Sequence, residues 1–359
     1  MFNRIGRFFS QTRKSMVGQW REANDEVMDE DNSWLKYGLL LLGLLFLVLV
    51  VMSFLWNAEP DTFDVREQAR QYMPEGQEAT FMPGVATTAT LIKVAETLLE
   101  KRGGYLTNDI MPPGVWLDNI PSWEYGVLIQ VRDLARVTRE SFSRSQSQSS
   151  EDDALKDAEA QFNFDNDSWI LPSTEDEYRR GIAYLHNYMG RLTDESKQNA
   201  QFYTRADNLR YWLGTVETRL GSLSQNLSAS VGQRRLNTDL AGDSSARQST
   251  STPEEYDVQT SWLRIDNEFY SARGAAWALL HFLKAAEIDF ADVLEKKNAR
   301  VSLQQIIREL EGTQQPLYSP MVLNGSGFGM LANHSLVMAN YISRANAALI
   351  DLRELLSRG

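Results

Sequence analysis

Residues 37–58 form the longest almost purely apolar run in the sequence and limit the fold more than any other segment. The run reads YGLLLLGLLFLVLVVMSFLWNA, and about 20 apolar residues in a helix span the roughly 30 Å hydrocarbon core of a bilayer. Side chains that prefer the headgroup level occur at its two ends, namely Trp34, Lys36, Tyr37 and Trp56. The sequence therefore predicts a transmembrane helix that contacts the lipid bilayer through residues 37–58.

The basic residues around this run predict its orientation, because cytoplasmic flanks carry an excess of Lys and Arg. The 20 residues after the run contain only two basic residues, Arg66 and Arg70. The 36 residues before it contain six, namely Arg4, Arg7, Arg13, Lys14, Arg21 and Lys36. We therefore expect residues 1–36 in the cytoplasm, either as an interfacial helix or as a flexible tail of basic and acidic residues. A cleaved signal peptide is a poorer interpretation, because no small-x-small cleavage site follows the run.

The composition excludes several kinds of site. The chain has no Cys, which rules out disulfides, thiolate nucleophiles and Cys-bound metals. His186, His281 and His334 lack the spacing of metal ligands, so we expect neither a metal nor another cofactor. The formal net charge is -12, and an acidic chain argues against nucleic acid as a partner.

The remainder of the chain favours helices nearly throughout. We expect an all-α fold in which one N-terminal transmembrane helix precedes an elongated periplasmic helical bundle with long coiled-coil-like helices. Prolines mark a stem over residues 59–83, and the bundle domain is expected over 84–359. Stretches of small polar residues predict mobile connectors near 141–150 and 237–252.

Apolar residues recur at steps of four and three, the spacing of helices that pack at shallow angles. We call the apolar residues that keep this spacing over 258–293 the seam. It follows a capping box at 252–255 and predicts one helix more than about 50 Å long. A second capping box, formed by Ser173 and Asp176, opens a helical zone over 173–231 that is either one helix or two.

The segment 103–144 is unusual for a helical domain, because it begins with a loop rich in Pro, Gly and Trp that is too long for a simple connection. Large aromatic side chains are seldom left in water. We therefore expect Tyr105, Trp116 and Trp123 to be packed, and we regard them as candidate binding residues.

Charged residues in the same segment are the candidates for chemistry. Arg132, Arg136 and Arg139 recur at helical spacing on one face, and they either bind a carboxylate or phosphate or pair with internal acids. Glu124 and Asp133 are weak candidates for a general acid and base, because a chance pair is expected among so many acidic residues.

The stretch GGYLTNDIMPPGVWLDNIPSWEYGVL, with the following RDLAR and SRSQSQS, resembles a family of uncharacterised single-span inner-membrane proteins of Gram-negative bacteria. The resemblance covers nearly the whole chain, the apolar run included. It implies a place in the bacterial inner membrane with the bulk of the chain in the periplasm. It implies no reaction and supplies no catalytic residue.

These observations favour a membrane-anchored, non-enzymatic scaffold or adaptor that binds an envelope protein or the cell wall. One alternative is a membrane-tethered enzyme that acts on peptidoglycan, with segment 103–144 lining its site. Another is a periplasmic bundle that binds a small ligand or lipid, which requires an apolar cavity. The identity of the partner and the oligomeric state stay open.

Overall fold

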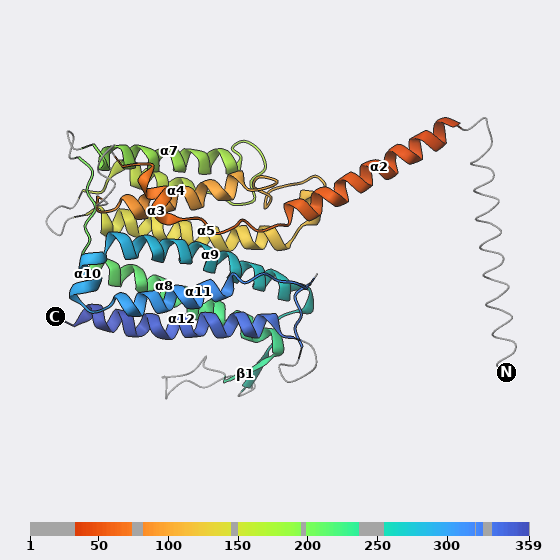
Figure 1. Ribbon diagram of the computed structural model, residues 1–359. Coiled ribbons are helices and arrows are strands. Elements are labelled where there is room, and N and C mark those ends of the chain that lie inside the picture. Colours follow the sequence, from red (N-terminus) through yellow and green to blue (C-terminus); the bar gives the residue numbers. More distant parts are fainter. Residues whose placement is uncertain are drawn as a thin grey trace, which may run out of the picture. The chain divides into compact units, whose positions relative to one another are not determined.

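The computed structural model describes residues 33–73, 82–144, 150–194, 199–236, 255–319, 321–325 and 332–358 (Figure 1). The chain divides into two compact units, Met1–Leu55 and Trp56–Gly359, and we call the second unit the helical body. Most of the predicted tail over 1–36 lies outside the described residues. The connector predicted over 237–252 and half of that over 141–150 also lie outside them.

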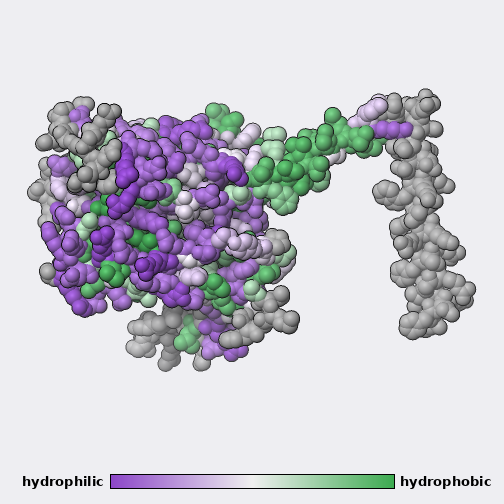
Figure 2. All heavy atoms as spheres, in the orientation of Figure 1, coloured by the Kyte–Doolittle hydropathy of each residue, from purple (hydrophilic) through white to green (hydrophobic). Residues whose placement is uncertain are grey.

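Helix α2 (Ser33–Trp56) contains the apolar run and exposes its side chains on all sides. Of the window from Trp34 to Trp56 that is apolar enough to cross a membrane, 0% is buried. Figure 2 shows α2 as a continuous hydrophobic surface, whereas the visible face of the helical body is mainly hydrophilic. The core helix of a soluble protein would be covered, so α2 is a candidate membrane span, a property that anchors share with signal sequences.

The helical body is built from helices joined by loops. Its α-helices are α3 (Val65–Arg70), α4 (Val85–Glu100), α5 (Asn119–Val137), α6 (Asp153–Phe162), α7 (Thr174–Leu192), α8 (Ala206–Ser228), α9 (Ile265–Asp289), α10 (Ala291–Lys296), α11 (Arg300–Thr313) and α12 (His334–Ser357). Short 3-10 turns occur at Gly114–Trp116, Ala229–Val231 and Trp262–Arg264, and α5 continues into a π-helical turn at Thr138–Phe142. The predicted helical fold class is therefore confirmed.

Helix α9 is the central element of the helical body. Nearly all of its side chains between Ala272 and Ala286 are buried, because α4, α5, α8, α11 and α12 all pack against it. A helix that is apolar on every side is stable only when neighbours surround it. The pairs α8 with α12 and α6 with α7 complete the packing on either side of this centre (Figure 1).

The prediction of one helix of about 50 Å over the seam 258–293 is wrong at its start. Strand β2 (Glu255–Val258) occupies the predicted first turn and pairs antiparallel with β1 (Gln233–Leu236). Helix α9 begins only at Ile265, after the 3-10 turn. The physical reason is that the first residues of the seam do not pack against the core. Trp262, one of these residues, is 81% exposed.

The seam also breaks near its end. Helix α9 stops at Asp289, so its 25 residues are about 37 Å long, and α10 follows as a separate element. The Asp289 carboxylate accepts the backbone N–H of Thr87 at 2.7 Å and thereby caps the first turn of α4. This contact and the burial of Phe290 among Phe142 and Phe202 hold the break in place.

The zone over 173–231 contains two helices. Helix α7 ends at Leu192 and α8 begins at Ala206. The Ser173 hydroxyl accepts the N–H of Asp176 at 3.3 Å, which is the expected N-terminal cap of α7. The described part of the connection is held by the Tyr188 hydroxyl, which donates to the carbonyl oxygen of Gln201 at 2.7 Å.

Candidate functional site

The loop over 103–118 is held against α5 by a fully buried carboxylate. Both oxygens of Glu124 accept hydrogen bonds, from the N–H of Leu106 and from the N–H of Thr107, each at 2.9 Å. The ammonium group of Lys101, also buried, lies 2.5 Å from Glu124. Burial raises the pKa of Glu124, and the charge of Lys101 acts in the opposite direction. The first candidate acid therefore fixes the loop and has no solvent contact.

The three aromatic residues of this segment have different surroundings. Tyr105 is buried and its hydroxyl donates to the carbonyl oxygen of Asn166 at 2.9 Å. Trp123 is completely buried, with its ring 5.3 Å from that of Trp277 between centroids. Trp116 departs from the expectation of packing, because it is 50% exposed in its 3-10 turn.

The second candidate acid, Asp133, is engaged by two arginines. Its carboxylate accepts from Arg219 Nε of α8 at 2.6 Å and from Arg136 Nη2 at 3.2 Å. Asp133 is nearly buried, so the ion pairs compensate the removal of its charge from water. The contact joins α5 to α8, which is a structural task.

The remaining two arginines of the predicted group also contact internal partners. Arg132 donates to the carbonyl oxygens of Phe162 and Phe164 at 2.7 and 2.8 Å, at the C-terminal end of α6. Arg139 forms an ion pair with Glu151 at 2.6 Å. The arginines that share a helix face thus reach separate partners and do not converge on one anion site.

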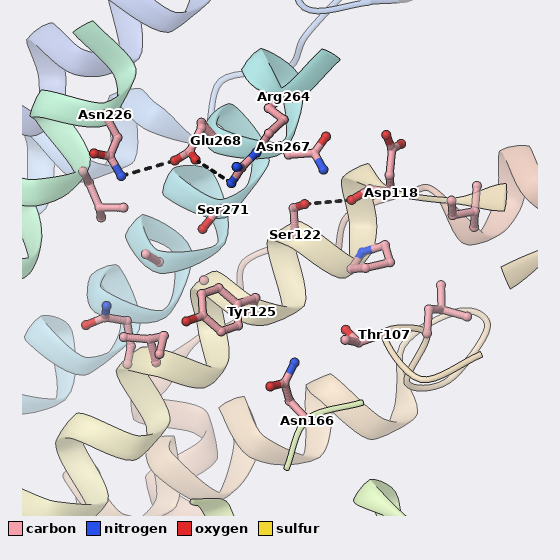
Figure 3. Close-up of a pocket in the computed structure, with 18 of the residues that line it drawn as sticks. Thr107, Asp118, Ser122, Tyr125, Asn166, Asn226, Arg264, Asn267, Glu268 and Ser271 are labelled. Atoms are coloured by element: carbon pink, nitrogen blue, oxygen red, sulfur yellow. Dashed lines mark hydrogen bonds and ion pairs between the residues drawn. The ribbon is translucent and has the colours of Figure 1, made fainter. Parts of the chain in front are cut away.

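A polar groove opens beside these networks, between the loop over 103–118, the start of α5, the C-terminal half of α8 and the first turns of α9. Its volume is about 700 Å³. Figure 3 shows residues that line it, among them Thr107, Asp118, Ser122, Tyr125, Asn166, Asn226, Arg264, Asn267, Glu268 and Ser271. Part of the segment singled out in the sequence therefore does line a groove, but neither Glu124 nor Asp133 is among the lining residues.

Nine of the 23 lining residues have neutral side chains that can form hydrogen bonds, and five others are charged. On the α8–α9 side, the Asn226 amide donates to Glu268 at 3.3 Å, and Arg264 lies 3.7 Å from the same carboxylate. On the α5 side, Ser122 donates to the carbonyl oxygen of Asp118 at 2.8 Å. The ring of Tyr125 is half-exposed between the two sides. Such a lining combines donors, acceptors and one aromatic surface, which suits an uncharged polar ligand or a peptide segment.

The acidic residues of the groove, Asp109, Asp118 and Glu268, were missed by sequence reasoning. Asp109 lines the groove, and burial raises its pKa with a further contribution from Glu175. It has room only because residue 114 is Gly, since a Cβ atom there would lie 1.9 Å from the Asp109 carboxylate. The position of Asp109 in the Pro-rich loop was the one available signal, and nothing in the sequence pointed to Glu268 on the opposite wall.

The three histidines lie in different surroundings. His281 is buried, His186 lies 3.4 Å from Glu96, and the Nδ1 atom of His334 accepts the N–H of Leu323 at 2.9 Å. Within the described parts of the chain, no group of three or more His, Asp or Glu side chains is arranged to hold a metal ion.

Comparison with known families adds one decisive match. The family model described as "Uncharacterized protein conserved in bacteria (DUF2333)" matches residues 28–359. The chain belongs to this family. The match covers both the apolar helix and the helical body. No curated protein and no solved structure matches the chain.

Proposed function

We propose that this DUF2333 protein is a membrane-anchored, non-enzymatic adaptor of the bacterial cell envelope. Helix α2 holds it in the inner membrane with the N-terminus in the cytoplasm, as the basic residues before the span indicate. The helical body lies in the periplasm. There it binds a segment of another envelope protein in the polar groove.

The observation that carries the proposal is the lining of the groove. Amide and hydroxyl groups such as those of Asn226, Ser122 and Ser271 can pair with the backbone of an extended peptide, and Tyr125 offers a flat contact for a side chain. The buried carboxylates of Glu124 and Asp133 form ion pairs that hold the walls together. A groove with rigid walls loses little entropy when a ligand binds.

A peptidoglycan-acting enzyme is the second candidate function, and Asp109 is the observation that favours it. A carboxylic acid with a raised pKa in a groove is a recognised general acid, and Glu268 lies on the opposite wall as a second carboxylate. In this reading the groove would bind a glycan strand, and Asp109→Asn would abolish its cleavage.

A third candidate, a carrier of a small apolar ligand, rests on a separate pocket. This pocket of about 280 Å³ lies between α9, α11 and α12 and is lined mainly by apolar side chains such as Phe269, Leu317 and Met338. Its volume is at the lower limit for a ligand of ordinary size, so we rank the carrier below the adaptor.

The adaptor proposal is tested by photo-crosslinking with the full-length protein in its own membrane. A photoreactive phenylalanine analogue replaces Tyr125 in the groove, and the control replaces Tyr211, which is equally exposed on α8 but does not line the groove. We expect a discrete adduct with an envelope protein from position 125 only. Ser222→Trp, which fills the groove from an exposed position, should remove the adduct, and Gln225→Trp on the same helix should not.

The same variants separate the adaptor from its alternatives. The full-length protein in mild detergent is incubated with purified sacculi, and the supernatant is analysed by mass spectrometry. Release of glycan fragments that Asp109→Asn abolishes would overturn the adaptor proposal in favour of an enzyme. If the protein instead sediments with the sacculi without releasing fragments, and Ser222→Trp prevents this sedimentation, the cell wall is identified as the partner.

A further inference from the structure

The helical body begins at Trp56, which is also the last residue of the apolar helix α2. Its ring packs against the core of the body beside Gly103, where a Cβ atom would lie 2.8 Å from the ring. The end of an apolar span is placed at the headgroup level, and tryptophan prefers that level. The part of the body around Gly103 is therefore tied by the chain itself to the membrane surface. We call this part the anchor end.

The loop that starts at Gly103 exposes apolar side chains at its tip. Met111 is 69% exposed, and Ile110, Val115 and Trp116 are each about half-exposed. The tip has the composition of a segment that inserts at a lipid interface, with aliphatic side chains, a tryptophan and two prolines in a compact turn.

Three further segments with exposed apolar tips lie at the anchor end, and two of them contact this loop. Asn108 donates to the carbonyl oxygen of Ser168 at 2.9 Å, next to the tip that contains Leu171, which is 90% exposed. The polar groove joins the same loop to the start of α9, which is preceded by the exposed Trp262 and Leu263.

The fourth segment follows α11. Arg273 joins it to the start of the body, because its guanidinium contacts Glu59 at 2.6 Å and the carbonyl oxygen of Gln315 at 2.9 Å. The tip beyond Gln315 carries Tyr318, which is 93% exposed, and Met321. Figure 1 shows the starts of α5, α9 and α12 together at the end of the body away from the C-terminus.

Exposed apolar residues are distributed differently toward the other end of the body. Among the described residues there, the large hydrophobic side chains with comparable exposure are Tyr211, Val301 and Ile350. They lie singly on three different helices, and isolated exposed residues of this kind are usual on soluble proteins. The concentration of apolar tips is thus a property of the anchor end.

We infer that the anchor end rests on the membrane, with the tips of these four segments inserted among the headgroups of the periplasmic leaflet. The inference rests on the proposed function only in taking α2 as the membrane anchor, and it does not depend on the groove. Because Asp109 and Asp118 also lie in the first loop, insertion relies on apolar contact and not on attraction to anionic lipid. Contact should therefore occur on zwitterionic lipid and persist at high salt.

The chain has no Cys, so single-Cys variants of the full-length protein allow a direct test. An environment-sensitive fluorophore is attached at Met111, Leu171 or Leu263 and, as controls, at Val301 or Ile350. A label at Leu45 in α2 serves as the reference for a residue inside the bilayer. Each protein is reconstituted in phosphatidylcholine vesicles with and without lipids that carry a quenching nitroxide, which is near the headgroup for the anchor-end and control sites and deep on the acyl chain for Leu45.

We expect about a twofold loss of fluorescence at the three anchor-end sites, because side chains that insert at the interface lie within about 10 Å of the nitroxide. Val301 and Ile350 should keep their fluorescence. Quenching at Leu45 without quenching at Met111, Leu171 and Leu263 would overturn the inference and leave the anchor intact. The same conclusion would follow if a second copy of the chain covered these three sites and kept the lipid nitroxide away from them. Absence of quenching at Leu45 would overturn the anchor itself, and with it the proposed function.

Discussion

Gly274 in α9 lies directly against the backbone of Trp123 in α5. A Cβ atom on Gly274 would lie 2.1 Å from the carbonyl oxygen of Trp123, and one on Gly126 would lie 2.0 Å from the carbonyl oxygen of Ser271. Each helix thus presents a glycine to the backbone of the other. This close crossing sets the distance between the two helices that form opposite walls of the polar groove.

Gly274→Ala should lower the free energy of unfolding by about 3 kcal/mol, because the new methyl group meets backbone atoms that cannot rotate away. The matched control is Gly190→Ala in α7, where no atom lies within 4 Å and where alanine should stabilise the helix by about 0.5 kcal/mol. Urea unfolding of the full-length protein in mild detergent, followed by circular dichroism, measures both. Equal effects of the two substitutions would show that the crossing is looser than described.

Glu124→Gln should lower the free energy of unfolding by about 3 kcal/mol, because the substitution leaves the buried ammonium group of Lys101 without a counter-charge. The double variant Lys101→Met with Glu124→Gln should recover part of this loss, since no buried charge then remains. A Glu124→Gln protein that keeps wild-type stability but loses an activity on sacculi would instead identify Glu124 as a catalytic acid.

His281 should make the body less stable as the pH falls. Its Nδ1 atom lies 2.7 Å from the carbonyl oxygen of Trp277, and its Nε2 atom accepts the N–H of Phe63 at 3.1 Å. Protonation of Nε2 would place two donors face to face, and burial already lowers the pKa from 6.5 to about 4. The unfolded chain therefore binds a proton that the folded chain does not, and the stability present above pH 6.5 is lost toward pH 4.

The measurement compares the wild type with His281→Gln, which keeps an acceptor but does not titrate. Between pH 7 and pH 4.5 the stability of the wild type should fall by about 2.5 kcal/mol relative to the variant, at about 1.4 kcal/mol for each pKa unit. Parallel profiles for the two proteins would contradict the prediction.

Asp289 should make the body less stable as the pH rises, which is the opposite of the effect of His281, over an overlapping pH range. Burial raises its pKa from 3.8 to about 6, so the folded state binds a proton more tightly than the unfolded chain. Its favourable contribution is complete below pH 3.8 and is lost as the pH rises through 6. Asp289→Asn should remove this slope, so the stability of the wild type relative to this variant should fall between pH 4 and pH 6.5.

A chain that begins at Trp56 should fold without α2 and stay in the supernatant when no lipid is present. It retains Glu59, whose carboxylate compensates the nearly buried guanidinium of Arg273, and its acidic residues oppose association. Sedimentation after lysis and circular dichroism of the supernatant measure the outcome. Glu59→Ala in this chain should reduce its stability by about 3 kcal/mol, because the buried guanidinium of Arg273 is then left without a counter-charge.

Local patterns predicted the elements whose signal is contained in neighbouring residues. The apolar run forms α2, and the Ser173 cap opens α7. The same method failed for the seam over 258–293, because its periodicity continues through a strand and past Asp289. It also gave no sign of α11, whose apolar stripe is short and becomes informative only when α9 and α12 cover it.

The sequence by itself determined that the chain has one helix able to span a membrane and a helical body without thiol chemistry, because length, apolarity and composition act locally. Only the tertiary structure decided that Glu124, Asp133 and Arg132 hold the body together, and that a groove with Asp109 and Glu268 on opposite walls lies beside them. Whether a charged side chain is paired or available depends on partners far away in the chain. Those partners are set by how helices pack, which no local pattern records.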